Sequence, residues 1–403
     1  MPNQTPKARY VQSEDDLQKM LDTTAHAFCE EFLRIRRDFA SHQQRPHHRP
    51  ELSRILEVDG RIVSSVLVVD RHFRIGASTL RLAGIGDVAT HPDERKHGYC
   101  ATLFQDVLRF MEEDGFHISL LFGIPNFYHR FGYAVALCSP SVAIPTGHLA
   151  ELNAAMPARP MRDDDLPALS ALLEADTLSR GCGLVRDDAY WRYYEDLRNR
   201  VTVLDDDGRP AAYFAARDEK TELVLDEAVV DGSEQACRSL LAYAGKRAKN
   251  AGKERVTLWA ITPDHPIGRL AAMCGAEFTA RYPRRSDAMM RIVRLHDTVA
   301  RLRPELERRL STSPMANQSA RFGVETDIGS FGLAIEEGSV RILPAAQPCA
   351  QMPQWALLQM AVGFASPADQ VLAGNASIPT EVMPWLSAMF PRRWPTVQPV
   401  DGF

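Results

Sequence analysis

The sequence predicts a mixed α/β and α+β fold in which one domain plan occurs twice and a smaller α+β unit follows. Three observations predict it. Residues 79–122 read as strand, loop, helix and strand, which is a βαβ unit, and residues 164–273 repeat this plan in a weaker form. The composition changes again near residue 297, and three of the five tryptophans follow it, Trp355, Trp385 and Trp394.

The first unit opens with a helical pattern from Asp15 to about Phe39, and strand patterns then run from residue 55 to residue 90. Apolar residues next recur at helical spacing, which predicts a helix that begins near Gly98 and ends before Gly115. These residues are Cys100, Leu103, Phe104, Val107, Leu108 and Met111. The segment HISLLF that follows reads as a buried strand.

The second and third units are assigned by the same patterns. In the second, helices are predicted over 164–176, 189–197, 234–250 and 267–273, and strands over 201–205, 211–217, 222–230 and 256–261. In the third, helices are predicted over 299–310 and 355–364, and strands over 321–327, 331–336 and 339–344. The predicted domains are 1–147, 148–296 and 297–403.

Composition narrows the class of protein. A chain of 403 residues, 45% hydrophobic and 25% charged, is long enough for two or three domains. No apolar run approaches the roughly 20 residues of a membrane-spanning helix, and the N-terminus lacks a secretory pattern, so we expect a cytoplasmic protein without membrane insertion. The net charge of −5 offers no basic stripe for nucleic acid and does not repel a cationic small substrate.

Neither cysteines nor histidines form a metal-binding pattern. The seven cysteines show no paired spacing and read as reduced thiols. His42, His47 and His48 lie between Pro46 and Pro50 or close to them, in a polar stretch that reads as a surface loop. We therefore expect no metal.

The segment RKHGYCA, residues 95–101, lies between a strand end and a helix start. The first turn of a helix has unpaired N–H groups and a partial positive charge, so it attracts anions. Gly98 lets a phosphate approach the backbone, and Arg95, Lys96 and His97 add positive charge. The segment therefore suits a pyrophosphate, although a helix entry with a solvated basic cluster is the simpler interpretation of the loop alone.

This segment resembles the signature of the Gcn5-related N-acetyltransferases, Gln/Arg-x-x-Gly-x-Gly/Ala. Arg95 and Gly98 match it, and Cys100 stands where Gly or Ala is usual. The resemblance implies that the loop and the two flanking strand ends bind acetyl-coenzyme A, with one backbone N–H holding the thioester oxygen. The implied residues are Val88, Ala89, Thr90, Arg95, Lys96, His97, Gly98, Tyr99, Cys100, Ala101, Gly123 and Ile124. The second copy has DGSEQA in place of RKHGYC, so we expect no cofactor there.

Over its whole length the sequence is similar to the enhanced intracellular survival family. That resemblance implies two tandem acetyltransferase-like domains, the second degenerate, a sterol-carrier-protein-like third domain and a homohexamer. It also implies acetyl transfer to a primary amine of a small molecule, such as an aminoglycoside or polyamine. Tyr128, in the segment YHRFGY, is implied as general acid, and the terminal carboxylate of Phe403 as general base.

Both implied roles are chemically sound. A phenol with a pKa near ~10 holds its proton at neutral pH and can give it to a departing thiolate. A terminal carboxylate is a weak base unless burial raises its pKa. Taken without the resemblance, Tyr128 reads as a packing aromatic beside Phe127, Phe131 and Tyr133, and the DGF end as a frayed terminus.

Three alternatives stay open. A covalent route through Cys100 is conceivable because a helix N-terminus lowers a thiol pKa. The third domain could carry a lipid or another apolar ligand while the first only senses coenzyme A. The first domain could also be a spent, regulatory copy. The identity of the amine lies beyond the sequence.

Overall fold

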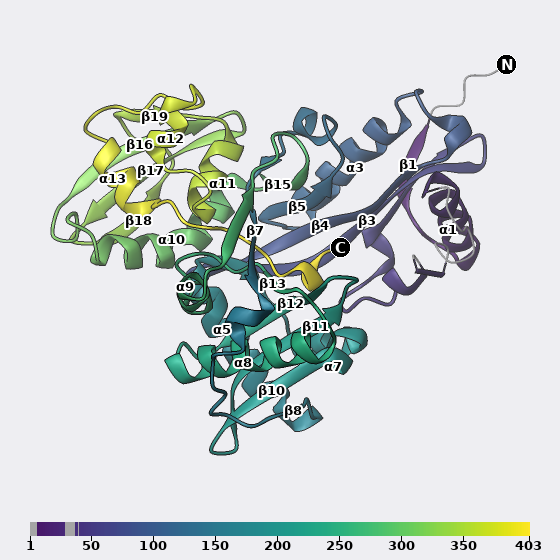
Figure 1. Cartoon of the computed structure of the whole chain (residues 1–403). Helices are drawn as coiled ribbons and strands as arrows, with labels where there is room; N and C mark the ends of the chain where they lie inside the picture. Colours follow the sequence, from purple (N-terminus) through teal and green to yellow (C-terminus); the bar gives the residue numbers. More distant parts are fainter. Residues whose placement is uncertain (1–5, 29–36, 39) are drawn as a thin grey trace.

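Three β-sheets organise the chain in the computed structural model, which describes residues 6–28, 37–38 and 40–403. Figure 1 shows them as three parts of the molecule, and the C-terminus lies where the parts meet. The mixed α/β and α+β fold class predicted from the sequence is confirmed.

The first sheet has eight strands in the order β1-β2-β3-β4-β5-β15-β6, with β9 paired to β3. Its strands are β1 (Lys7–Tyr10), β2 (Ser53–Val58), β3 (Arg61–Ile75), β4 (Ser78–Thr90), β5 (Ile118–Gly123), β6 (Ala134–Val135), β9 (Cys182–Leu184) and β15 (Asp287–Ile292). Helices α1 (Glu14–Phe28) and α3 (Tyr99–Glu113) pack on β3 and β4. The only parallel pair among the described strands of this sheet is β4–β5.

The second sheet has seven strands in the order β14-β7-β13-β12-β11-β10-β8. They are β7 (Ser139–Pro145), β8 (Ala158–Pro160), β10 (Val201–Asp206), β11 (Arg209–Asp218), β12 (Glu222–Val230), β13 (Arg255–Trp259) and β14 (Glu277–Arg281). The helices of this part are α4 (Thr146–Leu149), α5 (Leu166–Arg180), α6 (Asp188–Tyr193), α7 (Glu195–Arg200), α8 (Glu234–Asn250) and α9 (Pro266–Met273). The pair β12–β13 is parallel, so the order of the first copy is repeated.

The third sheet has four strands in the order β18-β17-β16-β19. They are β16 (Ala320–Thr326), β17 (Gly329–Glu336), β18 (Ser339–Leu343) and β19 (Cys349–Gln351). Its helices are α10 (Leu295–Ser311), α11 (Gln354–Val362), α12 (Pro367–Leu372) and α13 (Met383–Met389). Leu302 and Leu306 of α10 share one core cluster with Leu80 and Leu82 of β4, so the third part packs against the first sheet.

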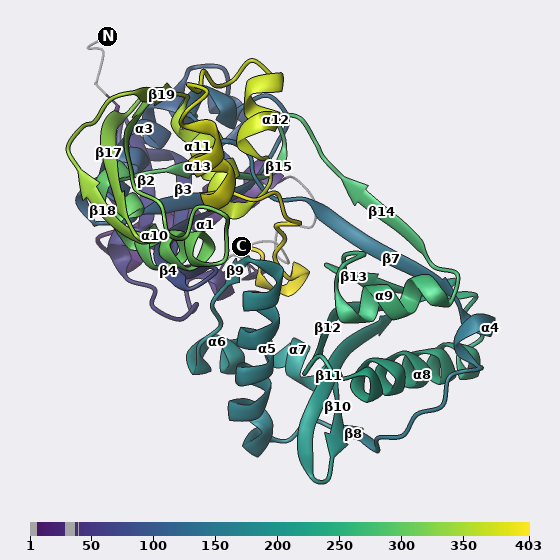
Figure 2. The same cartoon turned by 90° about the vertical axis from the view of Figure 1, so that its left-hand side faces the viewer.

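Two strands cross between the first two parts. After β6 the chain leaves the first sheet, and β7 pairs with β13 and β14 of the second sheet. The chain later returns, and β15 pairs with β5 and β6 of the first sheet. Figure 2 shows β7 and β14 as a long two-stranded ribbon that joins the two parts. The domain boundaries expected after residues 147 and 296 stay predictions. Strand β7 lies in the predicted range 1–147 but pairs with strands of the range 148–296, and β15 lies in the range 148–296 but pairs with strands of the range 1–147.

The local predictions agree with the structure except at a few ends. The helix expected over 189–197 is two helices, α6 and α7, because the backbone of Tyr194 leaves the helical region with a ψ of 55°. Of the helix expected from Asp15 to about Phe39, the structure describes α1 (Glu14–Phe28) and helical residues at 37 and 38, and residues 29–36 and 39 lie outside the described part of the chain. No described helix is both long enough and apolar enough to span a bilayer.

The described cysteines and histidines do not gather into a metal site. Six described cysteines are free thiols, and Cys29 lies outside the described residues. His42 bonds the carboxylate of Asp87 at 3.0 Å, and His47 bonds Asp187 at 2.6 Å. Within the described residues no three His, Cys, Asp or Glu side chains gather as a metal would require.

Candidate active site

The site begins where β4 and β5 stop pairing. Their parallel ladder runs from the pair Leu82–Ile118 to the pair Ile85–Leu121. Beyond it β4 continues to Thr90, whereas Phe122 and Gly123 of β5 keep only the pairing with β15 that runs along the other edge of β5. The two strands therefore diverge, and the β5-facing edge of Val88 to Thr90 has no strand partner among the described residues, so it can bind an extended ligand.

The loop after β4 presents a helix N-terminus without a side-chain cap. Gly98 is the N-cap of α3 with a φ of 81°, and no side chain bonds the first-turn N–H groups of the helix. A methyl group on Gly98 would meet no atom within 4 Å, so the approach to the backbone is open. This geometry fits a phosphate. Arg95 bonds the carbonyl oxygen of Ala27 at 2.7 Å in this state, so its charge lies beside the loop and not over it.

Tyr128 lies on the β5 side of the opening. It begins the 3₁₀ turn η3 (Tyr128–Phe131), is 6% exposed, and its ring covers Gly123, where a methyl group would lie 2.5 Å from Cδ2. Among the described residues none accepts a hydrogen bond from its hydroxyl, whereas the hydroxyl of Tyr133 donates to Ser119 at 2.7 Å. Burial, with Cys100 and Tyr133 nearby, raises the pKa of Tyr128 well above its usual value. The phenol therefore keeps its proton at neutral pH.

Cys100 lies next to Tyr128 and beside Thr90. Burial raises the pKa of its thiol to about 11, and a contact with Thr90 lowers it by less. The expected lowering of this pKa is therefore not found, because burial raises it. A thiol that stays protonated is a weak nucleophile.

Phe403 lies on the β4 side of the opening. Its ring covers Gly84, where a methyl group would lie 2.7 Å from the ring, and its carboxyl carbon would lie 3.2 Å from a methyl group on Gly86. The ring also meets Phe122 of β5 edge-on, with 5.7 Å between centroids. Gly86 lies one residue beyond the last β4–β5 pair and Gly123 lies two beyond it, so the carboxyl group and Tyr128 both lie near the end of this ladder, on opposite faces of the sheet.

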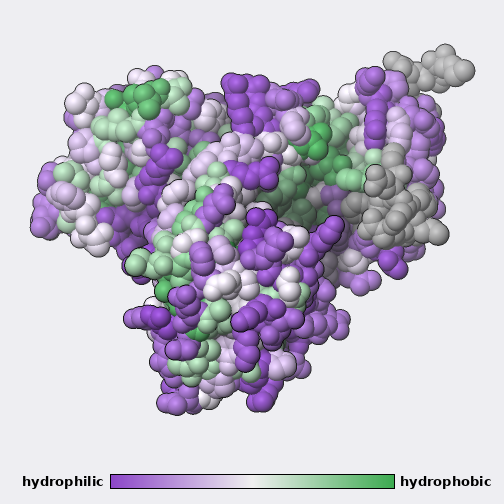
Figure 3. Space-filling model, viewed as in Figure 1, coloured by the Kyte–Doolittle hydropathy of each residue, from purple (hydrophilic) through white to green (hydrophobic). Residues whose placement is uncertain are grey.

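A pocket of about 470 Å³ adjoins Phe403. Figure 3 shows a hollow with apolar lining close to the place where Figure 1 marks the C-terminus. The walls come from β5, the start of β7, β12, the end of β13 and the chain from Thr396 to Phe403. A larger cavity of about 930 Å³ lies between α8 and α9, and its walls include neither Tyr128 nor Phe403, so it is separate from this site.

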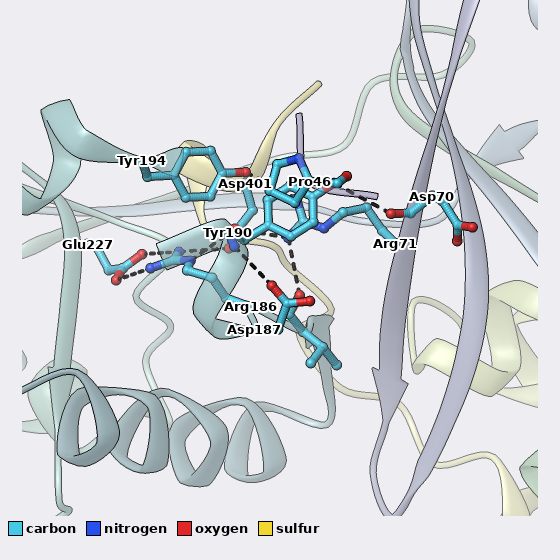
Figure 4. A network of polar contacts seen from close by, with 10 residues as sticks. Pro46, Asp70, Arg71, Arg186, Asp187, Tyr190, Tyr194, Glu227 and Asp401 are labelled. Carbon is cyan, nitrogen blue, oxygen red and sulfur yellow. Dashed lines mark hydrogen bonds and ion pairs between the residues drawn. The ribbon is translucent and has the colours of Figure 1, made fainter. Parts of the chain in front are cut away.

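A buried ion-pair network holds the tail that ends at Phe403. Asp401, in η5 (Pro399–Asp401), bonds Arg186 at 2.9 Å and Arg71 at 3.3 Å, and Arg186 bonds Glu227 at 2.7 Å. All four side chains are at most 2% exposed. Figure 4 shows Arg186 between Glu227 and Asp401, so the second domain, β3 and the tail meet in one network. We call this network the tail clamp.

Aromatic rings complete the tail clamp. The guanidinium of Arg71 lies 3.8 Å from the ring centre of Tyr190, and that of Arg186 lies 4.5 Å from the ring centre of Trp191. Burial alone would raise the pKa of Asp401, but Arg186 and Arg71 more than offset it and hold that pKa below its usual range. Asp401 is therefore ionised throughout the neutral range.

The structure gathers most residues that the sequence singled out, and it adds others. Those at or beside the opening are Val88, Ala89, Thr90, Gly98, Tyr99, Cys100, Ala101, Gly123, Ile124, Tyr128 and Phe403. Lys96 and His97 are exposed in the loop, where His97 lies near the carbonyl oxygen of Glu94. Sequence reasoning missed Gly84, Gly86 and the tail clamp. The alternation Gly84-x-Gly86 within an apolar strand was an available signal of close approach.

Comparisons with known proteins agree with this geometry. The family described as acetyltransferase (GNAT) domain matches residues 7–136. Residues 7–136 are thus similar to GNAT acetyltransferase domains. No relative of curated function matches the chain.

Solved structures with the GNAT fold match the whole chain. A GCN5-related N-acetyltransferase from Anabaena variabilis superposes with a TM-score of 0.79 at 18% identity, covering 99% of this chain and 100% of that one. A GCN5-related N-acetyltransferase from Kribbella flavida superposes with a TM-score of 0.74 at 19% sequence identity, covering 99% of each chain. Eis1 from Mycobacterium abscessus superposes with a TM-score of 0.69 at 15% sequence identity, covering 99% of this chain and 100% of that one. These likenesses show the fold, with tandem GNAT-type domains and a further domain.

The tail clamp predicts a strong effect of Asp401→Asn. The substitution removes the carboxylate that pairs with Arg71 and leaves Glu227 as the carboxylate that pairs with Arg186. It should lower the free energy of unfolding by about 3 to 5 kcal/mol, because both arginines stay buried. Because the pKa of Asp401 is depressed, its contribution is complete above the unfolded pKa of about 3.9 and is lost as the pH falls through the folded value. Urea unfolding at several pH values measures this.

Asp207→Asn, in an exposed turn, is the matched control and should change little. Carboxypeptidase should release Phe403 faster from the Asp401 variant than from the wild type. Equal unfolding midpoints and equal release rates in both proteins would contradict a clamp at Asp401.

The glycines of β4 predict a coupling to the tail. In Gly84→Ala the new methyl group displaces the ring of Phe403, which should cost about 1 to 3 kcal/mol of stability. In a chain that lacks residues 401–403 the same substitution should cost much less, because no ring lies there. The double-mutant cycle is measured by urea unfolding, with Gly147→Ala as control since no atom lies near that position. Additive effects at Gly84 would refute this contact.

Proposed function

We propose that this chain is an acetyl-coenzyme A-dependent N-acetyltransferase that acts on a primary amine of a small molecule. The observation that carries the proposal is the divergence of β4 and β5, with Tyr128 on one side and the carboxyl group of Phe403 on the other. The GNAT domain over residues 7–136 supports acyl transfer as the reaction class.

The residues present fit acetyl-coenzyme A. The unpaired β4 edge at Val88 to Thr90 suits the extended pantetheine arm, and the uncapped first turn at Tyr99 to Ala101 suits the pyrophosphate. Acetyl-coenzyme A supplies an acetyl group activated as a thioester. A backbone N–H of the β4 edge would stabilise negative charge on the acetyl oxygen.

The two flanking groups divide the proton transfers. The carboxylate of Phe403 attracts an ammonium group and takes its proton, which frees the amine lone pair for attack. Tyr128 holds its proton because burial raises its pKa. It can give that proton to the departing thiolate while it regains one from the nitrogen, which loses its second proton as the amide forms. Transfer is direct, since the raised pKa of Cys100 argues against an acetyl-cysteine.

The carrier alternative gains no support from the third domain. Its apolar interior, between α10, the sheet and α11, encloses a cavity of only about 10 Å³ among the described residues. One water molecule needs about that volume, and a lipid chain needs far more. The resemblance of this domain to sterol carrier proteins therefore stays a hypothesis about fold.

The proposal includes the expectations about family, oligomeric state, location and partners that were drawn from the sequence. Membership of the enhanced intracellular survival family, a homohexamer, a cytoplasmic location and the absence of metal and nucleic acid all rest on the sequence. The fold that is shared with Eis1 of Mycobacterium abscessus supports the first of them.

Converting the carboxylate of Phe403 to a carboxamide tests its role as base. The amide keeps the ring and the size of the group but removes the negative charge, so turnover should fall by roughly 10² to 10⁴ while acetyl-coenzyme A binding is unchanged. Thiol release measures turnover, and calorimetry measures binding. A tag after Phe403 should have the same effect, and a tag before Met1 should not. Unchanged turnover of the carboxamide protein would exclude Phe403 as the base.

Tyr128→Phe tests the acid. Loss of the phenol should reduce kcat by roughly 10² to 10⁴ with little change in the KM for acetyl-coenzyme A, because the ring still covers Gly123. Cys100→Ala, at a neighbouring buried side chain, is the control and should retain activity. If Tyr128→Phe keeps full activity, or if Cys100→Ala loses it, the direct mechanism is wrong.

A further inference from the structure

The pocket beside Phe403 indicates which amines the site accepts, an inference that rests on the proposed function. We propose that the acceptor carries one positive charge on an aromatic or otherwise apolar body, and that polycationic amines are poor acceptors.

The charges of the pocket leave one carboxylate for a substrate. Asp226 of β12 lines the pocket, but its two oxygens bond Arg200 at 2.7 Å and Arg217 at 2.9 Å. Asp401 is enclosed in the tail clamp. Among the described residues that line the pocket, only the terminal carboxylate of Phe403 has no cationic partner. The pocket therefore offers one favourable position for an ammonium group.

The walls around that position are apolar. Phe122, at the end of β5, is 40% exposed and meets the ring of Phe403, and Trp259, at the end of β13, faces the same pocket. Leu137 and Val397 add aliphatic surface. With Phe122 and Trp259 in its walls, a pocket of about 470 Å³ suits the body of a small aromatic amine.

Gln398 supplies a second polar contact. It lines the pocket, is 8% exposed, and its Oε1 has no hydrogen-bond partner among the described residues. A buried amide oxygen without a partner is costly, so an N–H group from a ligand would satisfy it. An indole N–H or the acceptor amine itself can donate here.

A second ammonium group would find no compensation. Arg217 and Asp226 of the wall compensate each other, and Glu219 also pairs with Arg217, so neither side chain attracts a second ammonium group. Transfer of a second charge onto the walls of Phe122 and Trp259 is unfavourable. A polyamine or an aminoglycoside must place several charges, whereas 2-phenylethylamine or tryptamine places one. The lack of a second unpaired carboxylate therefore selects against the polycations that the sequence resemblance implies.

A panel of amines tests this with the full-length protein. We expect kcat/KM for tryptamine and 2-phenylethylamine to exceed that for putrescine, spermidine and kanamycin by at least about tenfold, measured by thiol release with product mass as confirmation. A polyamine or kanamycin as the better acceptor would overturn this inference and leave the proposed function standing. Binding of acetyl-coenzyme A without transfer to any amine would overturn both.

Two variants locate the selectivity. Arg217→Gln removes the ion pair with one oxygen of Asp226, so that this oxygen can pair with a second ammonium group, and it should shift the kcat/KM ratio toward putrescine by about tenfold. Trp259→Ala should raise the KM for 2-phenylethylamine about tenfold without changing that for acetyl-coenzyme A. Trp355→Ala is the control, because Trp355 is also partly buried and lies outside the pocket. An unchanged ratio in Arg217→Gln together with an unchanged KM in Trp259→Ala would contradict the inference.

Discussion

The candidate active site depends on one buried pair of carboxylates and two arginines. Asp401 and Glu227 enclose Arg186, and Arg71 completes the charge balance, with every member nearly inaccessible to water. Such a network contributes little net stability when it is complete, but it strongly penalises any arrangement that omits one partner. The tail is therefore held in one position, and the ring and carboxyl group of Phe403 are placed by it.

The second domain has a structural part in this arrangement. Its parallel pair β12–β13 ends at Leu225–Leu258, as the pair β4–β5 ends in the first domain, and the strands continue beyond it. In the first domain that divergence exposes a free edge. In the second, Glu227 lies just beyond the last pair and bonds Arg186, and η5 packs on β12. The same feature of the fold thus forms an opening in one copy and a docking place for the tail in the other.

Sequence reasoning succeeded where the information is local. The helical spacing of residues 100–111 and the loop RKHGYC specify α3 and its open N-terminus through near neighbours alone. The exchange of β7 and β15 between sheets was not predictable, because strand pairing between residues more than about 100 positions apart leaves no trace in periodicity. Arg71 and Arg186 read as ordinary arginines, since their burial depends on a partner at Asp401 far along the chain.

In the proposed mechanism, a carboxylate at Phe403 has one advantage over a side-chain carboxylate as the base. Asp401 fixes the backbone two residues before the carboxyl group, and Phe403 fixes it again through ring contact with Gly84 and Phe122. The carboxyl group between these anchors has few rotatable bonds, so its position is set by the backbone. The absence of a side chain at Gly84 and Gly86 permits this approach. The third domain, packed on β4 through α10, then directs the chain back across the molecule to reach that point.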